Sequence, residues 1–314
     1  MEILFKMKNS HLRLIGLSLL ALATAPVLAA EPTTDSEQEE PGSLVLERIE
    51  REREVQDNRS VLLAHKRNYI LPLTYANNPN DEVFEVGSSD FGENLDNVEM
   101  QFQLSLKAPI SEGLFTEQDA LFFGFTVRAF WQAYNKDISA PFRETNYEPE
   151  IYWATPVPWE IFGGDASFVA LGLSHQSNGR SQLFSRSWNR LYAAIAWERW
   201  RYLFALKAWW RIPEDDKDDP LDARGDDNPD IEDYLGNFEF TVAYRKFDHE
   251  IAVMLRNNLD SDDNRGAIQV DWTFPMHRRF RGYVQFFNGY GESLIDYDQH
   301  IERIGVGILL SDLL

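Results

Sequence analysis

The chain of 314 residues contains no cysteine, so no disulfide framework can stabilise it. Beyond an apolar stretch near its start it also lacks any run of eighteen apolar residues, which excludes an ordinary transmembrane helix. Basic residues are scarce, since 30 Lys and Arg face 51 Asp and Glu for a formal net charge of −21. Nucleic acid is therefore not an expected partner, and stability must come from packing or from barrel closure.

The first thirty residues combine a basic start, an apolar segment at 14–22 and small residues around Ala29. This pattern predicts a cleaved signal peptide over residues 1–30. Residues 31–66 are first acidic and then amphipathic, and we expect them to form a short N-terminal extension in the periplasm. An exported chain without a spanning helix is either a secreted soluble protein or a β-barrel of an outer membrane.

The remaining chain, residues 67–314, alternates apolar and polar residues in segments rich in Phe, Tyr, Trp, Val and Leu, which is typical of strands. The expected strands span 67–75, 97–108, 120–134, 145–156, 166–178, 187–198, 201–212, 232–246, 248–258, 265–275, 279–290 and 300–312. Twelve antiparallel strands favour a closed transmembrane β-barrel in an outer membrane, and a soluble all-β sandwich is the alternative. Several tryptophans, including Trp188 and Trp209, are expected in aromatic girdles near strand ends, and the acidic segment 214–233 is expected to be a solvated loop.

A histidine and a serine share one face of the strand expected at 166–178. Because side chains alternate across a strand, His175 and Ser177 point to the same side. Leu171 and Leu173 occupy the preceding positions on that side, which is therefore apolar. Such a placement suits a substrate that is itself apolar and approaches from outside the sheet. The G-x-S-x-G elbow of soluble lipases is absent from the whole chain, so elbow-type hydrolase chemistry is not expected.

The next strand can bring an amide to the same face. A hairpin that pairs Ser177 with Ser187 also pairs His175 with Asn189, and directly opposed residues share a face. Histidine is the natural base for a serine hydroxyl near neutral pH. An amide can hold the imidazole in the required tautomer without the cost of placing a carboxylate against hydrocarbon. The pattern predicts Ser177 as nucleophile, His175 as base and Asn189 as orienting residue, and polar interfacial residues without a catalytic role are the alternative.

The segments His175–Arg180 and Ser185–Tyr192 resemble those of the outer-membrane phospholipase A family of Gram-negative bacteria. Further segments that carry the resemblance are Pro141–Pro149, Asp227–Ile231, Asn288–Tyr297 and Arg303–Leu313, so that it covers most of residues 68–314. It implies a twelve-stranded outer-membrane barrel that hydrolyses the 1- and 2-acyl esters of glycerophospholipids and lysophospholipids, active as a calcium-bound homodimer. Ser177, His175 and Asn189 match the family's nucleophile, base and orienting amide.

The resemblance also implies a calcium site and an oxyanion site. The carbonyl of Arg180 and the hydroxyl of Ser185 match calcium ligands from one subunit, and Ser139 would reach across from the other. Neutral oxygens of this kind are acceptable calcium ligands. The backbone N–H of Gly179, together with calcium-bound water, would then form the oxyanion site.

One position departs from the family pattern. Val127 stands where the family often has a glutamine that hydrogen-bonds across the dimer, so a more apolar interface is expected. Arg143, Glu144 and Glu148 are expected to form a polar network inside the barrel. Two other functions stay open, namely a passive barrel or small pore and an acyltransferase that passes the acyl chain to another lipid.

Overall fold

The computed structural model of the protein describes residues 62–85, 94–181, 183–222, 224–277 and 280–311, together with Arg48 and Glu52. All of these belong to one compact unit, Pro41–Leu314. The expected signal peptide at 1–30 and most of the expected extension at 31–66 lie outside the described residues. Within the described part of the chain, no helix is both long and apolar enough to cross a membrane.

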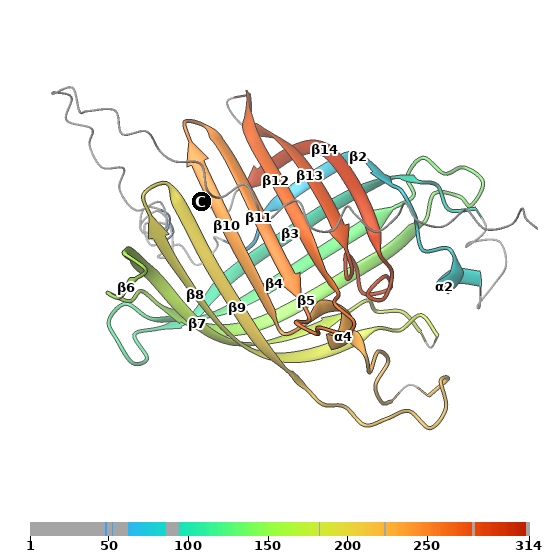
Figure 1. The fold of residues 1–314 in the computed structure, drawn as a ribbon, viewed down its shortest axis with the longest axis horizontal. Coiled ribbons are helices and arrows are strands. Elements are labelled where there is room, and N and C mark those ends of the chain that lie inside the picture. The colour runs from blue at the N-terminus through green and yellow to red at the C-terminus, as the bar shows by residue number, and fades with distance from the viewer. Residues whose placement is uncertain are drawn as a thin grey trace, which may run out of the picture. The chain divides into compact units, whose positions relative to one another are not determined.

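Twelve long strands build one antiparallel sheet (Figure 1). They are β2 (Asn68–Ala76), β3 (Val98–Glu112), β4 (Ala120–Trp131), β5 (Phe142–Thr155), β7 (Gly164–Ser177), β8 (Ser187–Arg199), β9 (Tyr202–Ile212), β10 (Phe238–Lys246), β11 (His249–Asn257), β12 (Gly266–His277), β13 (Phe280–Gly289) and β14 (Ile301–Ser311). The short elements are β1 (Leu63–Ala64), β6 (Glu160–Ile161), α2 (Glu82–Glu85) and α4 (Ile231–Leu235).

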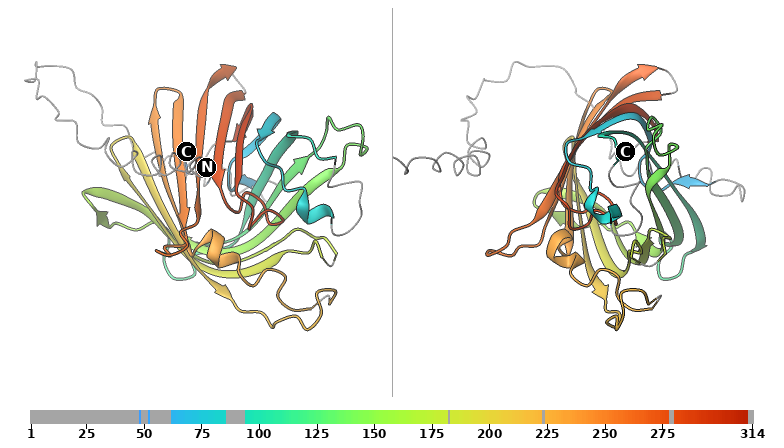
Figure 2. Two further views of the ribbon diagram at one scale, coloured as in Figure 1. Left: turned by 45° about the vertical axis from the view of Figure 1, so that its right-hand side comes forward. Right: turned by 90° about the vertical axis from the view of Figure 1, so that its right-hand side faces the viewer.

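The sheet closes on itself. Strand β3 pairs with both β2 and β4, and β14 pairs with β2, so every long strand has a neighbour on each edge. The strands curve into a ring that is visible in the right-hand view of Figure 2. Closure removes the unpaired backbone groups of an open sheet, which is what hydrocarbon requires of a spanning structure. The expected twelve-stranded antiparallel barrel is confirmed, and the soluble sandwich is not what this chain forms.

One expected strand begins too early. The sequence pattern predicts a single strand over 232–246, but α4 occupies Ile231–Leu235 and β10 begins only at Phe238. Gly236 separates the two with a φ of 65°, a conformation that side chains disfavour. A Cβ added there would lie 2.2 Å from the carbonyl oxygen of Asn257. Alternation alone could not predict this stop. Ile231 and Leu235 are four residues apart, and that spacing places two apolar residues on one face of a strand as well as on one face of a helix.

Charged residues line the barrel interior and form ion pairs with one another. Arg143 is 1% exposed and pairs with Asp296 at 2.6 Å and with Glu99 at 3.1 Å. Glu148 lies 2.6 Å from Lys66. Paired and hydrogen-bonded charges are the form in which ionised groups are tolerated away from water. The expected inner polar network around Arg143, Glu144 and Glu148 is confirmed, since all three are buried or near-buried inside the sheet.

Two tryptophans expected in the aromatic girdles point inward instead. Trp188 and Trp209 are buried, and their rings meet edge to face at 6.1 Å. The indole N–H of Trp188 donates to Gln176 Oε1 at 2.8 Å, and the Arg190 guanidinium lies 4.1 Å above its ring. These polar contacts satisfy the indole of Trp188 in the lumen. Trp210, the next residue after Trp209, does face outward.

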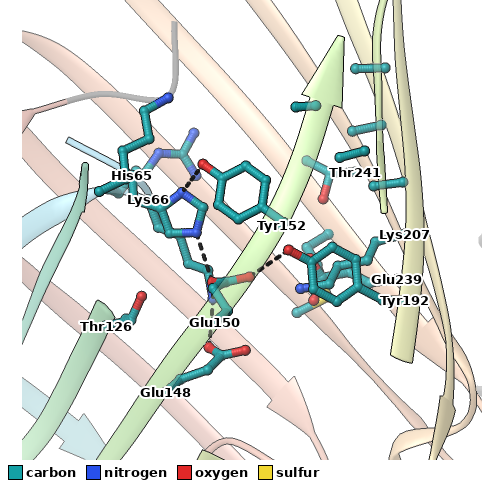
Figure 3. A pocket seen from close by; sticks show the side chains of 18 of the residues that line it. His65, Lys66, Thr126, Glu148, Glu150, Tyr152, Tyr192, Lys207, Glu239 and Thr241 are labelled. Atoms are coloured by element: carbon teal, nitrogen blue, oxygen red, sulfur yellow. Dashed lines mark hydrogen bonds and ion pairs between the residues drawn. The ribbon is translucent and has the colours of Figure 1, made fainter. Parts of the chain in front are cut away.

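The lumen retains a cavity of about 860 Å³. Figure 3 shows part of its lining, where His65 Nε2 and the Tyr192 hydroxyl both contact Glu150 at 2.7 Å, and the Tyr152 hydroxyl lies 3.2 Å from His65 Nδ1. The sheet separates this cavity from the outer surface of the barrel. The hydrogen bonds and ion pairs within the lumen connect side chains of different strands and stabilise the barrel from inside.

We expect Arg143→Met to lower the free energy of unfolding by about 3–5 kcal/mol, because it leaves the Glu99 and Asp296 carboxylates buried with less cationic charge. Urea unfolding of the protein in lipid vesicles, followed by tryptophan fluorescence, measures the change. The matched control is Arg201→Met, which removes the same charge from an exposed turn between β8 and β9 and should change stability by less than about 0.5 kcal/mol. Equal losses in the two variants would show that the buried ion pairs do not support the barrel.

Candidate active site

The hairpin of β7 and β8 carries the three residues of the expected catalytic trio. Its register pairs His175 with Asn189 and Ser177 with Ser187, which confirms the expected pairing. The Nδ1 atom of His175 lies 2.8 Å from Asn189 Oδ1. A carbonyl oxygen can only accept, so Nδ1 carries the proton and Nε2 presents its lone pair.

Ser177 lies two residues beyond His175 on the same face of β7. Its hydroxyl makes no hydrogen bond to the imidazole in the part of the chain that the structure describes. The structure therefore brings His175 and Asn189 into contact and places Ser177 beside them, at the end of the strand. Catalytic hydrogen bonds are often long before substrate binds and tighten in the productive complex.

The face that carries the trio is apolar and points away from the lumen. Leu171, Leu173 and Leu191 are 55%, 49% and 48% exposed. The alternate positions, including Gly172, point inward. A Cβ at position 172 would lie 2.6 Å from the Tyr192 ring and 2.7 Å from Tyr152, so a glycine is required there. The apolar setting expected for the trio is confirmed.

Gly179 and Tyr147 lie next to Ser177 at the end of β7. Gly179 has a φ of 64°, which turns the chain just after the strand and is readily adopted by glycine. Tyr147 of β5 pairs with Ser177 in register, and its ring would lie 3.4 Å from a Cβ at position 179. The sequence pattern does not identify Tyr147. The periodicity of a single strand does not show that β5 pairs with β7, which follows it in the chain after the short strand β6.

A further residue that the sequence did not reveal is Glu214, whose Oε1 accepts a hydrogen bond from Asn189 Nδ2 at 3.0 Å. It follows β9 by two residues, and β9 pairs with β8 so that Ile212 faces Asn189. The only signal in the sequence is that the outward positions Trp210 and Ile212 are followed, two residues later, by Glu214.

Known proteins match this chain over most of its length. Residues 45–310 match the profile of a family described as Phospholipase A1. The Phospholipase A1 of Klebsiella pneumoniae is 32% identical over 96% of this chain and 99% of its own length. The Phospholipase A1 of Escherichia coli strain K12 is 34% identical over 82% of this chain and 84% of its own. The chain belongs to the phospholipase A1 family.

Solved structures of this family share the fold. An active-site mutant of outer membrane phospholipase A from Escherichia coli superimposes with a TM-score of 0.75 at 33% identity, over 82% of this chain and 95% of that one. The Salmonella typhi outer membrane phospholipase, described as a dimer with bound calcium, has a TM-score of 0.74 at 33% identity, over 82% of this chain and 94% of that one. This protein is accordingly an outer-membrane phospholipase, a carboxylic ester hydrolase of Gram-negative bacteria.

The expected calcium ligands of this phospholipase lie around the β7–β8 turn and on a separate loop. The guanidinium of Arg180 pairs with Glu144 at 3.2 Å. A guanidinium cannot bind a cation, so the backbone carbonyl is the ligand that Arg180 can offer. The hydroxyl of Ser185 donates to Asp227 Oδ2 at 2.6 Å. Ser139 is exposed on the loop between β4 and β5. Oxygen donors of this kind fit calcium, and the described residues hold no cluster of three or more His, Cys, Asp or Glu that could bind a metal by itself.

The acidic segment 214–233 packs against the site and is not simply a solvated loop. Asn228 is fully buried and accepts a hydrogen bond from the Ser187 backbone N–H at 3.0 Å. The Arg211 guanidinium pairs with Asp226 at 2.5 Å. The expectation of a solvated loop was wrong for these residues, because charge density along the sequence does not reveal which carboxylates meet a cation.

We expect Leu171→Arg to lower the free energy of unfolding in vesicles by about 2–4 kcal/mol, because Leu171 lies mid-strand on the outward face and an arginine there meets hydrocarbon. Urea titration in bilayers of defined thickness measures the cost. Leu221→Arg is the matched control, since Leu221 is similarly exposed but sits in the 213–230 loop, and its change should stay within about 0.5 kcal/mol. A tolerated arginine at 171 would contradict a lipid-facing site.

Proposed function

We propose that this phospholipase hydrolyses the 1- and 2-acyl esters of glycerophospholipids and lysophospholipids through Ser177, His175 and Asn189, as a calcium-dependent homodimer. The observation that carries the proposal is the 2.8 Å contact between His175 Nδ1 and Asn189 Oδ1 on the outward face of the barrel. A base oriented by a neutral amide, with a serine two residues away, has the parts of a nucleophilic ester hydrolase.

The reaction proceeds in two halves. The Ser177 hydroxyl attacks the ester carbonyl carbon while His175 Nε2 takes its proton, and the backbone N–H of Gly179 donates to the oxyanion that forms. The imidazolium then gives the proton to the departing glycerol oxygen, which leaves the acyl group on Ser177. Water attacks this acyl-enzyme while His175 takes its proton. The bond between the acyl carbon and the Ser177 oxygen then breaks, the imidazolium returns the proton to that oxygen, and the fatty acid is released. Asn189 accepts from the imidazole Nδ1–H throughout and keeps Nε2 turned towards the reaction.

The outward face supplies the substrate-binding surface. A lipid in the outer membrane reaches Ser177 without leaving the hydrocarbon, because Leu171, Leu173 and Leu191 lie directly before the trio on the same face. The acyl chain there exchanges contacts with other lipid chains for contacts with leucine side chains, so binding does not expose it to water. A glycerophospholipid whose acyl chain lies along this face thus has its ester at the level of the serine.

The residues available for calcium suggest that two subunits share the ion. The Arg180 carbonyl and the Ser185 hydroxyl are neutral oxygens of one chain, and the partner subunit's Ser139 would add another. Few and uncharged ligands make a weak site, which the second subunit strengthens. When bound, calcium supplies a cation that polarises the ester carbonyl and stabilises negative charge on its oxygen.

The dimer interface is proposed to include the outward face of β4. Leu104, Val127 and Tyr147 face one another across β3, β4 and β5, and Tyr147 in turn faces Ser177. This row connects the position at which the family often has a glutamine with the nucleophile. A dimer that covers Val127 therefore also brings a second barrel next to the catalytic trio.

Ser177→Ala should reduce calcium-dependent release of fatty acid from mixed micelles of phospholipid and detergent by at least about 1,000-fold, because the nucleophile is lost. Ser187→Ala is the matched control, since Ser187 faces Ser177 across the hairpin without a proposed role, and it should retain activity. Removal of calcium with a chelator should abolish wild-type activity. Retained hydrolysis in Ser177→Ala would sink the proposed mechanism.

The products distinguish the other functions. Acylation of an added acceptor lipid in preference to release of fatty acid would identify a transferase that uses the same acyl-enzyme. Ion conductance in planar bilayers, together with no reaction of Ser177 with a sulfonyl fluoride, would identify a passive pore.

Val127→Gln should strengthen the dimer by about 3- to 30-fold in its dissociation constant, because a polar contact between two chains in hydrocarbon contributes about 0.6–2 kcal/mol. Energy transfer between labelled subunits in vesicles, measured against protein density, gives the constant. The control Val242→Gln places the same side chain on the outward face of β10, several strands away. If both variants behave alike, the interface does not lie at β4.

A further inference from the structure

The Asn189 amide makes two hydrogen bonds, and they run in opposite senses. Its Oδ1 accepts from His175 at 2.8 Å, and its Nδ2 donates to Glu214 Oε1 at 3.0 Å. An amide turned by half a circle would instead direct its oxygen at the carboxylate and its N–H₂ at the imidazole. The first contact would be repulsive, and the second would force Nδ1 to accept.

The tautomer of His175 depends on which way this amide points. If Nδ1 accepts, the proton of the neutral imidazole must sit on Nε2, where it prevents the ring from acting as a base towards Ser177. A carboxylate beside Nδ2 stabilises the orientation in which Oδ1 faces the ring. Its effect therefore reaches the reacting atoms through two successive hydrogen bonds.

We infer that Glu214 is a positioning residue that holds the Asn189 amide in the orientation needed for His175 to act as a base. The inference rests on the proposed function, because it assigns Glu214 a role in the same reaction. It extends the trio to a fourth residue, contributed by the loop that follows β9.

The backbone delivers Glu214 to this place. Ile212, the last residue of β9, pairs with Asn189, so the outward position two residues later lies diagonally beside the amide. The loop after Glu214 is closed by a hydrogen bond of 2.8 Å from the Asp226 N–H to the Asp215 carbonyl. The buried Asn228 then ties the far end of the loop to Ser187.

The charges around Glu214 come from this closed loop and from β9. Burial and the neighbouring Asp226 raise the pKa of Glu214 above its ordinary value, and Asp227 adds to this, whereas the Asn189 hydrogen bond and Arg211 lower it. Arg211 is itself paired with Asp226, and Lys217 with Asp227. Protonation of Glu214 weakens the hydrogen bond from Asn189, so the contribution of Glu214 is present above its pKa and is lost as the pH falls through it.

The same contact explains why an amide suits position 189 in this chain. An aspartate there would place a second carboxylate against Glu214 at hydrogen-bonding distance, and two such groups cannot both be ionised without a large cost. Asn189→Asp should therefore be harmful in the native chain and less harmful when Glu214 carries no charge. This sign of coupling is specific to a direct contact between the two side chains.

The experiment measures kcat and KM on phospholipid micelles for five variants of the full chain. Glu214→Ala should lose about tenfold in kcat with little change in KM, whereas Glu214→Gln, which can still accept from Asn189, should stay within about threefold of the native rate. Asp216→Ala removes an exposed carboxylate from the same loop and is the matched control. The double variant that combines Asn189→Asp with Glu214→Gln should have a kcat about tenfold or more above that of Asn189→Asp alone.

Two further readouts separate positioning from folding. The acid limb of the pH–rate profile should lose the Glu214 contribution in Glu214→Gln. The ¹⁵N shifts of His175 in detergent should show the Nδ1–H tautomer in the native chain and in Glu214→Gln, and a mixture of tautomers in Glu214→Ala.

The outcomes are distinct. If Glu214→Ala keeps the native kcat and tautomer, or if Asn189→Asp is equally slow with and without the Glu214→Gln substitution, Glu214 is only a loop residue and the inference is wrong while the trio stands. If Ser177→Ala, assayed alongside, remains active, the proposed function itself fails and the inference falls with it. A loss in Glu214→Ala that is matched by Asp216→Ala would indicate general damage to the loop and would also overturn it.

Discussion

Closure of the backbone hydrogen-bond ladder between β3 and β4 is the constraint on which the rest of the molecule depends. In hydrocarbon an unpaired N–H or C=O has no water to turn to, so a sheet that spans a membrane has to have no free edge. Once closed, every strand has one face towards the lumen and one towards lipid. The alternation of polar and apolar residues is then a division between two environments.

That division explains the contrast between the two sets of polar groups. Inside, Arg143 is buried in ion pairs with Glu99 and Asp296, and Arg303 pairs with Glu99 as well. These groups stabilise the barrel without contacting substrate. Outside, His175 and Asn189 stand among leucines, where a neutral pair is far less costly than an ion pair. A carboxylate enters the outer arrangement only beyond the strand end, at Glu214, where the chain leaves the apolar band.

The local pattern carried much of the site because β7 and β8 are consecutive and joined by a turn. The outward direction of His175 and Ser177 and the pairing of His175 with Asn189 follow from strand periodicity and one assumed register, and the structure has that register. The roles of Ser139, Arg180 and Ser185 depend on resemblance, and they remain proposals. Tyr147 and Glu214 could not be predicted, because their contacts with the trio come from β5 and from a loop beyond β9.

By itself, the amino-acid sequence determined the fold class, the number of strands and the face on which the trio lies, because these depend on a two-residue period and on alternating polarity. Only the tertiary structure decided that Trp188 and Trp209 face inward, that α4 replaces the start of an expected strand, and that the acidic loop folds back onto the site. These features depend on contacts between residues distant in the chain, and several residues of the same polarity could make each contact. Which carboxylate meets which amide or guanidinium is settled by the closed ring of strands and not by the order of residues.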